Sequence, residues 1–248
     1  MSRELVWIQS HERLPDASSA MTDPPGLVAA GLDLSTARLQ EAYQKGIFPW
    51  FSEGQPVLWW SPDPRMVLYT DELHISHSLK KRLRQVHKSG DTDSHAGWTV
   101  TTDLAFESVM QGCAQRGTDT LQDTWINQVM QQAYSDWHQL GDAHSIEVWH
   151  NKALIGGLYG VSLGTMFFGE SMFTRATDAS KVALVYLVHF LRQQGVKLID
   201  CQMQTAHLER LGAREVSRQS FLKHVQTAVQ QTPLRWPAGR IYLENHSG

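Results

Sequence analysis

The chain has 248 residues, of which 42% are hydrophobic and 19% are charged, and its formal net charge at pH 7 is −3. This length and apolar content allow one large domain or two smaller ones with a substantial core. The small negative charge excludes a protein that is basic throughout, although it is compatible with a local basic patch.

Neither a targeting segment nor a membrane span is expected. The N-terminal stretch MSRELVWIQSHERLPD lacks the uninterrupted apolar run of a signal peptide, and no later segment reaches the apolar length that a bilayer requires. Cys113 and Cys201 lie far apart and show neither paired nor metal-ligand spacing, which suits a reducing compartment. We therefore expect a cytoplasmic protein that contacts no membrane.

The first quarter of the chain is rich in proline and aromatic residues. Residues 1–64 hold seven prolines and one predicted helix, at 37–45, which Ser35 can cap and Gly46 can end. We expect most of the aromatic residues in core or interdomain packing. The alternative is a pocket for a ring of a ligand. The aromatic group consists of Tyr43, Phe48, Trp50, Phe51, Trp59 and Trp60.

A basic segment, SLKKRLRQVHK, occupies residues 78–88. In a helix, Leu79, Leu83 and Val86 would share one face, with cations beside it. Such a run is usually a solvated face, yet it would also suit contacts with the phosphates of a nucleic acid that are independent of base sequence. The cations are Lys80, Lys81, Arg82, Arg84 and Lys88.

From residue 95 onward, helical and extended patterns alternate. The predicted strands lie at 95–100, 144–150, 154–161, 165–173, 196–202 and 213–217. The predicted helices lie at 102–116, 125–140, 179–194, 205–211 and 221–229. Asp178 occupies the N-cap position of the helix at 179–194, and Gly195 its C-terminal stop. This order indicates an α/β (α+β) domain with a mixed sheet, in which helix 179–194 joins two parallel strands.

The strand at 196–202 carries the candidate chemistry. Because side chains alternate across a strand, we expect Asp200 and Gln202 on one face and Cys201 on the other. A carboxylate and a carboxamide near a strand end need partners if they are buried, so a hydrogen-bonded polar pair and a functional site both stay open. The opposite parity of Cys201 argues against a nucleophilic role.

The order of hairpin, crossover helix and strand resembles the fold of the acetyl-coenzyme A dependent N-acetyltransferases. In that family, backbone N–H groups of a glycine-containing turn before the central helix hold the pyrophosphate. The corresponding turn here, FTRATDAS at residues 173–180, contains no glycine. This resemblance therefore implies the fold, while the glycine-free turn argues against coenzyme A.

Six motifs, taken in order, closely resemble the bacterial leucyl/phenylalanyl-tRNA–protein transferase family: AYQKGIFPWF, LWWSPDPR, HSIEVW, FFGESMF, ASK and KLIDCQ. The match runs from about Gly26 to the final helix. It implies transfer of leucine, phenylalanine or methionine from aminoacyl-tRNA to the N-terminal amine of proteins that begin with arginine or lysine, which marks them for N-end rule degradation. It also implies a small N-terminal domain, residues 1–64, beside an acyltransferase-like domain, residues 65–248, and a reaction that needs no metal or organic cofactor.

The resemblance also implies the roles of individual residues. The acid–amide pair of the family falls on Asp200 and Gln202, its substrate-contacting glutamate on Glu170, and a pocket methionine on Met172. The aromatic residues of the aminoacyl-adenosine site match Tyr43, Trp50 and Trp125, and the tRNA-contacting segment matches the basic residues at 80–88.

Two positions depart from the family pattern. Leu158 stands where methionine is expected in the substrate pocket, which affects the preference between leucine and phenylalanine. Phe168 is larger than the small residue expected there, and the expected effect is a narrower pocket.

The reaction that the family performs needs little covalent help, because an aminoacyl ester is already activated. It needs an uncharged, close and oriented amine, and an α-amino group has a pKa near ~7.7–8. We expect the Gln202 carboxamide oxygen to accept a hydrogen bond from this amine while Asp200 polarises the N–H side of Gln202. The proton then passes to Asp200, to water or to a ribose hydroxyl. Glu170 either offers negative charge to a substrate cation or pairs with Arg175 or Lys181.

Three other functions stay open from the sequence. They are a coenzyme A dependent N-acetyltransferase, a tRNA-dependent aminoacyltransferase acting on cell-wall precursors, and a tRNA-binding module without catalytic activity. Only the binding module has no need of Asp200 and Gln202.

Overall fold

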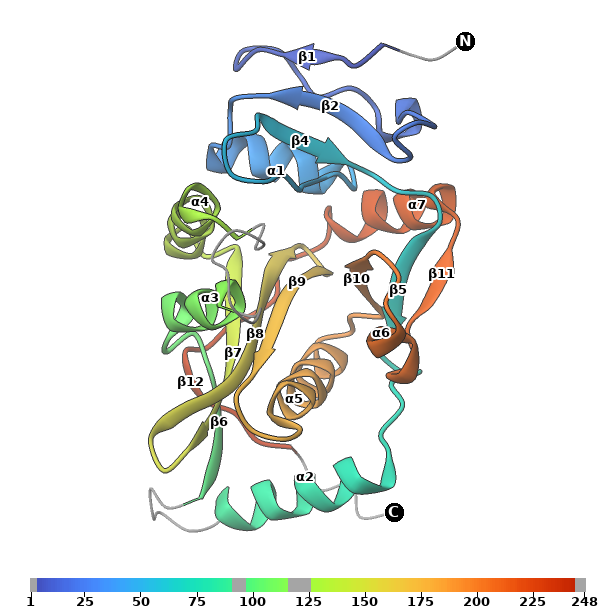
Figure 1. Cartoon of the computed structure of the whole chain (residues 1–248). Coiled ribbons are helices and arrows are strands. Elements are labelled where there is room, and N and C mark those ends of the chain that lie inside the picture. The colour runs from blue at the N-terminus through green and yellow to red at the C-terminus, as the bar shows by residue number, and fades with distance from the viewer. Residues whose placement is uncertain (1–3, 91–96, 116–125, 244–248) are drawn as a thin grey trace.

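The computed structural model describes residues 4–90, 97–115 and 126–243. A small sheet with one helix lies at one end of the molecule, and a larger sheet covered by helices makes up the rest (Figure 1). Within the described ranges, no helix combines the length and the apolar character needed to cross a membrane.

The N-terminal part forms the small sheet. Its strands are β1 (Trp7–Ile8), β2 (Leu27–Gly31), β3 (Phe48–Pro49) and β4 (Val57–Trp60). They are arranged in the order β1-β2-β4-β3, in which only β1 and β2 are parallel. A 3-10 turn, η1 (Ala17–Ser19), precedes β2. None of these short strands was predicted from the sequence.

The predicted N-terminal helix is confirmed as α1 (Thr36–Gln44). The Ser35 hydroxyl accepts the backbone N–H of Arg38 at 3.3 Å, so the predicted cap is present. Gly46 follows with φ 68°, and a Cβ atom there would lie 2.5 Å from a methyl group of Leu222. Both the backbone conformation and the close approach therefore require glycine at this stop.

The large sheet has eight strands. They are β5 (Arg65–Tyr69), β6 (Trp98–Thr102), β7 (Ala143–His150), β8 (Ala153–Leu163), β9 (Met166–Thr174), β10 (Leu198–Gln202), β11 (Arg214–Val216) and β12 (Gly239–Arg240). The order is β11-β5-β10-β9-β8-β7-β6-β12. Only β9 and β10 pair in parallel, and the other neighbours are antiparallel. The predicted mixed sheet is confirmed, whereas β5 and β12 were missed.

Helices cover both faces of the large sheet. They are α2 (His77–Gly90), α3 (Phe106–Ala114), α4 (Gln128–Gln139), α5 (Ala179–Gln193), α6 (Ala206–Arg210) and α7 (Arg218–Ala228). α3 and α4 pack on one face of the sheet at β7 and β8, and α5 packs on the other face (Figure 1). α2 packs against β6 and α5. As predicted, α5 joins the two parallel strands β9 and β10.

The start of α5 differs from the prediction. Asp178 has φ 68°, in the left-handed region, and its carboxylate accepts from Lys181 Nζ at 2.9 Å instead of from a backbone N–H. The predicted side-chain cap is therefore wrong. The predicted stop is confirmed, because Gly195 follows the helix with φ 81°.

One hydrophobic cluster joins the small sheet to the large one. Tyr43 and Trp59 are fully buried, and the Tyr43 ring meets Trp137 and Phe168 edge-on at centroid distances of 5.2 and 5.0 Å. The expectation that most of the aromatic group packs in the core is confirmed, because four of its six members are buried, whereas Trp60 is partly buried and Trp50 is 39% exposed. The chain passes from the small sheet to the large one between β4 and β5, near residue 64. The division into two domains at that residue stays a prediction.

Candidate active site

A cavity of about 280 Å³ lies where β9 and β10 separate. The two strands pair only at Phe167 with Ile199 and at Phe168 with Asp200. After these pairs β9 continues along β8, whereas β10 ends at Gln202. Residues of α5, of α6 and of β3 at the edge of the small sheet border the space between them.

The wall of the cavity is mostly apolar, with a few polar groups, as is typical of a small-molecule site. The apolar side chains come from β3, β5, β8, β9, α5 and β10 and include Phe48, Leu68, Leu158, Met172, Leu184, Leu187 and Ile199. The polar groups come from β9, β10 and α6 and include Glu170, Ser171, Cys201, Gln202, Thr205 and His207.

Asp200 lies behind this wall in a buried ion pair. It is 0% exposed, and its carboxylate receives Arg65 Nε at 2.8 Å and Arg65 Nη2 at 2.6 Å. Arg65 Nη1 also donates to the Gly46 carbonyl oxygen at 3.2 Å, and the guanidinium lies 4.8 Å from the centroid of the Phe48 ring. This two-point contact fixes β10 against β5 and against the turn after α1.

Sequence reasoning gave Arg65 no role. A carboxylate within an apolar strand does imply a buried cationic partner, because an isolated buried charge is too costly. The partner here is 135 residues away along the chain, so residue spacing carried no signal that could select Arg65 among the cations.

A bulge turns the end of β10, so Asp200 and Gln202 do not share a face. The register against β5 shifts between these two residues, and Gln202 has φ 56°, in the left-handed region. The side chains of Cys201 and Gln202 both line the cavity, while Asp200 faces Arg65. The predicted common face is therefore wrong, because alternation holds only in a regular strand.

The contact between Asp200 and Gln202 also differs from the expected one. Asp200 Oδ1 accepts the backbone N–H of Gln202 at 3.0 Å, and the Gln202 carboxamide donates from Nε2 to Glu170 Oε1 at 3.3 Å. Asp200 therefore stabilises the unusual backbone of Gln202, and Glu170 is the carboxylate that contacts its side chain.

Cys201 lines the cavity together with Ile199, on the opposite face of β10 from Asp200 as parity predicted, and it is the bulge that brings Gln202 to the same cavity. Burial, reinforced by the nearby charge of Asp200, raises the pKa of its thiol far above the ordinary value. The thiol therefore stays protonated at neutral pH, and the prediction that it is no nucleophile now rests on this pKa instead of on parity.

Glu170 is held by two tyrosines. The Tyr43 hydroxyl donates to Oε1 at 2.7 Å. The Tyr134 hydroxyl lies 3.3 Å from Oε2 and also contacts the Tyr43 hydroxyl, so its single proton serves one of these two contacts at a time. Lys181 instead pairs with Asp178, and Arg175 lies over the Phe173 ring. Of the two alternatives for Glu170, the pairing with Lys181 or Arg175 is therefore wrong.

The surroundings of Glu170 change its acidity. Burial raises the pKa of this carboxyl group to about 8, and the negative charge of Asp200 acts in the same direction. Hydrogen bonds from Tyr43 and Tyr134, and the charge of Arg65, oppose this rise only in part. Burial and the nearby Glu170 raise the pKa of both tyrosines well above the ordinary value, so both hydroxyls remain donors.

The remaining predicted pocket residues fall into distinct places. Leu158 and Met172 are paired across β8 and β9 and both line the cavity, while Trp50 lies at its edge next to Trp60. Phe168 is 1% exposed and packs on Tyr43 in the core, so the expectation that it narrows the pocket is wrong. Trp125 lies outside the described residues.

The basic segment forms α2, at the opposite end of the molecule from the small sheet (Figure 1). Its predicted apolar face is confirmed, since Leu79, Leu83 and Val86 are buried. Lys80, Lys81 and Arg84 are exposed. Arg82 is partly buried, with its guanidinium 4.9 Å from the centroid of the Trp98 ring, and the side chain of Lys88 lies outside what the structure describes.

One Asp–His–His group has ligand atoms close enough for a metal ion. The atoms of Asp103, His138 and His144 lie within 4.8 Å of one another, away from the cavity. The Asp103 carboxylate already contacts His144 Nδ1 at 2.7 Å and the Ser145 N–H at 2.8 Å, and His138 Nδ1 lies 2.7 Å from the Ala143 carbonyl oxygen. We interpret the group as a hydrogen-bonded cluster.

Comparison with known proteins assigns the chain to a family. The family model described as leucyl/phenylalanyl-tRNA protein transferase matches residues 67–226, and the model of the corresponding N-terminal domain matches residues 32–63. The chain belongs to the leucyl/phenylalanyl-tRNA–protein transferase family. It is therefore an aminoacyltransferase, and the resemblance seen in the six sequence motifs is confirmed.

Curated leucyl/phenylalanyl-tRNA–protein transferases match over almost the whole length. The protein of Bordetella bronchiseptica is 52% identical over 240 residues, which cover 96% of this chain and 93% of that protein. The protein of Janthinobacterium sp. is 50% identical over 230 residues, covering 91% and 93%. The protein of Burkholderia multivorans is 48% identical over 245 residues, covering 98% and 94%.

Solved structures with a related arrangement include a GCN5-related N-acetyltransferase from Kribbella flavida. The TM-score is 0.35 and the sequence identity is 9%, and the aligned region covers 72% of this transferase and 60% of the acetyltransferase chain. The predicted mixed sheet with a small N-terminal part is confirmed by the two sheets themselves, while the likeness to the acetyltransferases stays a prediction.

Proposed function

We propose that this aminoacyltransferase moves leucine or phenylalanine from aminoacyl-tRNA to the N-terminal amine of proteins that begin with arginine or lysine. The observation that carries the proposal is the cavity between β9 and β10, in which an apolar wall faces Gln202 and Glu170. The apolar wall suits the apolar side chain of the donor amino acid, and the polar groups of Gln202 and Glu170 suit the amine and the ester.

The apolar part of the cavity suits the side chain of the transferred amino acid. Leu158 and Met172 lie opposite each other on neighbouring strands, and Leu184 and Leu187 of α5 continue the same wall. A methionine side chain also fits such a wall, which makes methionine a further candidate donor. Trp50, exposed at the edge of the cavity, offers a flat face to the terminal adenosine, and we assign Trp125 to the same role.

Gln202 is placed to orient the attacking amine. Its backbone is held in the left-handed conformation by the hydrogen bond to Asp200, which is itself fixed by Arg65. We therefore propose Asp200 and Arg65 as positioning residues and Gln202 as the residue that contacts the amine. The amine nitrogen then forms a bond to the ester carbon, the bond to the ribose oxygen breaks, and positioning supplies much of the rate.

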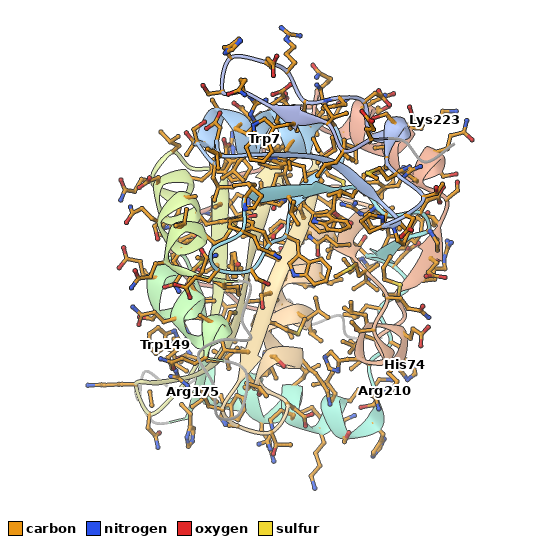
Figure 2. The ribbon with its side chains drawn as sticks, turned by 45° about the horizontal axis from the view of Figure 1, so that its top comes forward. Trp7, His74, Trp149, Arg175, Arg210 and Lys223 are labelled. Atoms are coloured by element: carbon orange, nitrogen blue, oxygen red, sulfur yellow. The ribbon has the colours of Figure 1, made fainter. Side chains whose placement is uncertain are left out.

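The body of the tRNA requires a basic surface outside the cavity. Lys80, Lys81 and Arg84 on α2 are exposed. Arg210 of α6 lies near the start of α2 (Figure 2), while His207 of the same short helix lines the cavity. We propose that the acceptor arm runs from α2 past α6 to the cavity, with the cations contacting phosphates.

The proposal is tested by transfer of labelled phenylalanine from Phe-tRNA to a peptide beginning with arginine, beside the same peptide beginning with alanine. We expect label on the arginine peptide alone. Label on neither peptide, with tRNA still bound, would contradict the proposal and favour the cell-wall enzyme or the binding module. Transfer from acetyl-coenzyme A would instead support the N-acetyltransferase.

A further inference from the structure

We infer that Glu170 carries the proton of the transfer reaction, taking it from the attacking amine and delivering it to the ribose oxygen that leaves. This inference rests on the proposed function. It assigns the chemical step to β9, whereas the acid–amide pair of the sequence motif lies on β10.

The position of Glu170 is the first argument. Among the described residues that line the cavity, Glu170 is the one carboxylate. Its Oε1 atom lies 3.3 Å from Gln202 Nε2, so a group held by the Gln202 carboxamide is within reach of the carboxylate. Asp200 is closed off by Arg65, and an uncharged carboxamide such as Gln202 cannot take a proton at neutral pH.

The chemistry of the step balances with one carboxyl group. The amine nitrogen forms the new bond to carbon and releases one proton to a Glu170 oxygen. The bond between carbon and the ribose oxygen breaks with its electron pair on oxygen, and that oxygen takes the proton from Glu170. Glu170 thus ends in the state in which it began, and no co-reactant is needed.

The acidity of Glu170 suits this exchange. Its pKa of about 8 lies close to that of an α-amino group, about 7.7–8, so proton transfer between them is nearly balanced. The same raised pKa leaves Glu170 mostly protonated near pH 7, which argues against the sequence-based role as a fixed negative charge for a substrate cation.

The surrounding groups support a carboxyl that changes its charge. Two tyrosine hydroxyls from α1 and α4 donate to its oxygens and stabilise the ionised form. Arg65, whose charge acts on the pKa of Glu170, is hydrogen-bonded to Asp200. The titratable or charged groups that face Glu170 or share its cavity are Tyr43, Tyr134, Tyr159, Asp200, Arg65, Cys201 and His207.

The pH profile of the isosteric variant Glu170→Gln tests the inference. In the wild-type enzyme both the amine and Glu170 must lose a proton, so the logarithm of kcat/KM should rise with pH with a slope approaching about two below pH ~7. In Glu170→Gln the slope should fall to about one, and kcat at pH 7 should fall by roughly 10²–10⁴-fold. The control Glu107→Gln removes an exposed carboxylate on α3, which lies neither at the cavity nor on the proposed tRNA path, and should match wild type.

A tyrosine variant provides a second, independent readout. Tyr43→Phe removes the hydrogen bond that most lowers the pKa of Glu170, so this pKa should rise further. The rate at pH 7 should then drop several-fold and recover at higher pH. The matched control is Tyr186→Phe, which removes a buried tyrosine hydroxyl on α5 and should leave the profile unchanged.

The protonation state can also be measured without activity. Infrared difference spectra between wild type and Glu170→Gln should show a carboxylic acid band that disappears as the pH rises through about 8. A Glu170→Gln enzyme with unchanged kcat and the two-proton slope, or with only a raised KM, would overturn the inference. A wild-type enzyme that transfers no phenylalanine at any pH would instead overturn the proposed function.

Discussion

Two carboxylates on neighbouring strands, Asp200 of β10 and Glu170 of β9, lie on either side of Gln202 and have opposite kinds of partner. Asp200 is fully buried against a two-point contact from Arg65. The hydrogen-bond donors to Glu170 among the described residues are all uncharged: Tyr43, Tyr134 and the Gln202 amide. Burial alone therefore does not decide what an acid does. A cationic partner makes it part of the framework, and neutral partners leave it free to exchange a proton.

The largest effect is expected when Asp200 loses its cationic partner. Arg65→Met leaves the Asp200 carboxylate buried without its cation, so the free energy of unfolding should fall by about 3–5 kcal/mol. Urea denaturation at pH 7 measures it. The matched control, Arg214→Met, removes one partner of the exposed pair with Glu72 and should cost less than about 1 kcal/mol. Equal losses in the two variants would contradict a framework role for the buried pair.

The next effect is the pH dependence of stability that Glu170 causes. Its pKa rises from 4.5 to about 8 on folding, so its contribution to stability is complete below about pH 4.5 and is lost as the pH rises through about 8. Between pH 5 and pH 9 the wild-type protein should lose on the order of 2–3 kcal/mol relative to Glu170→Gln, a value reduced because the side chain is partly exposed. Parallel pH dependence of the two proteins would refute the raised pKa.

The smallest effect is expected on tRNA binding by α2, which should change without any change in the chemistry at the two carboxylates. Replacing Lys80 and Arg84 together by alanine should weaken tRNA binding and reduce the salt slope by about 0.7–0.9 for each phosphate that is no longer neutralised. The pH profile of the bound reaction should not change, because α2 does not line the cavity. Titration of tRNA binding at several salt concentrations measures both the affinity and the slope. A slope identical to wild type would remove α2 from the tRNA path.

Local features of the sequence predicted much of the fold. The hydroxyl of Ser35, the glycine at 195 and the apolar spacing of Leu79, Leu83 and Val86 each act within a few residues, and all three predictions are confirmed. The cap at Asp178 failed although its position was correct, because Lys181 takes the carboxylate. The other wrong predictions concerned side chains whose partners lie far away in the sequence.

The candidate site shows the same limit. The motifs identified Glu170, Gln202, Leu158 and Met172, and all four meet at one cavity. Tyr134 was missed, since its helix was predicted but its contact with Tyr43 spans 91 residues of sequence. Alternation misplaced Gln202 relative to Asp200 because the bulge at Gln202 depends on pairing with β5, a strand that the sequence pattern did not reveal.

The sequence by itself determined the helices, the central hairpin, the mixed sheet and the family, because each rests on local spacing or on short motifs. Tertiary structure alone decided which acid receives a cation and which receives tyrosines. That choice depends on β5, α1 and α4 converging on β9 and β10. Acidity follows from the desolvation and the charges that this convergence creates, and neither is a property of the residues in isolation.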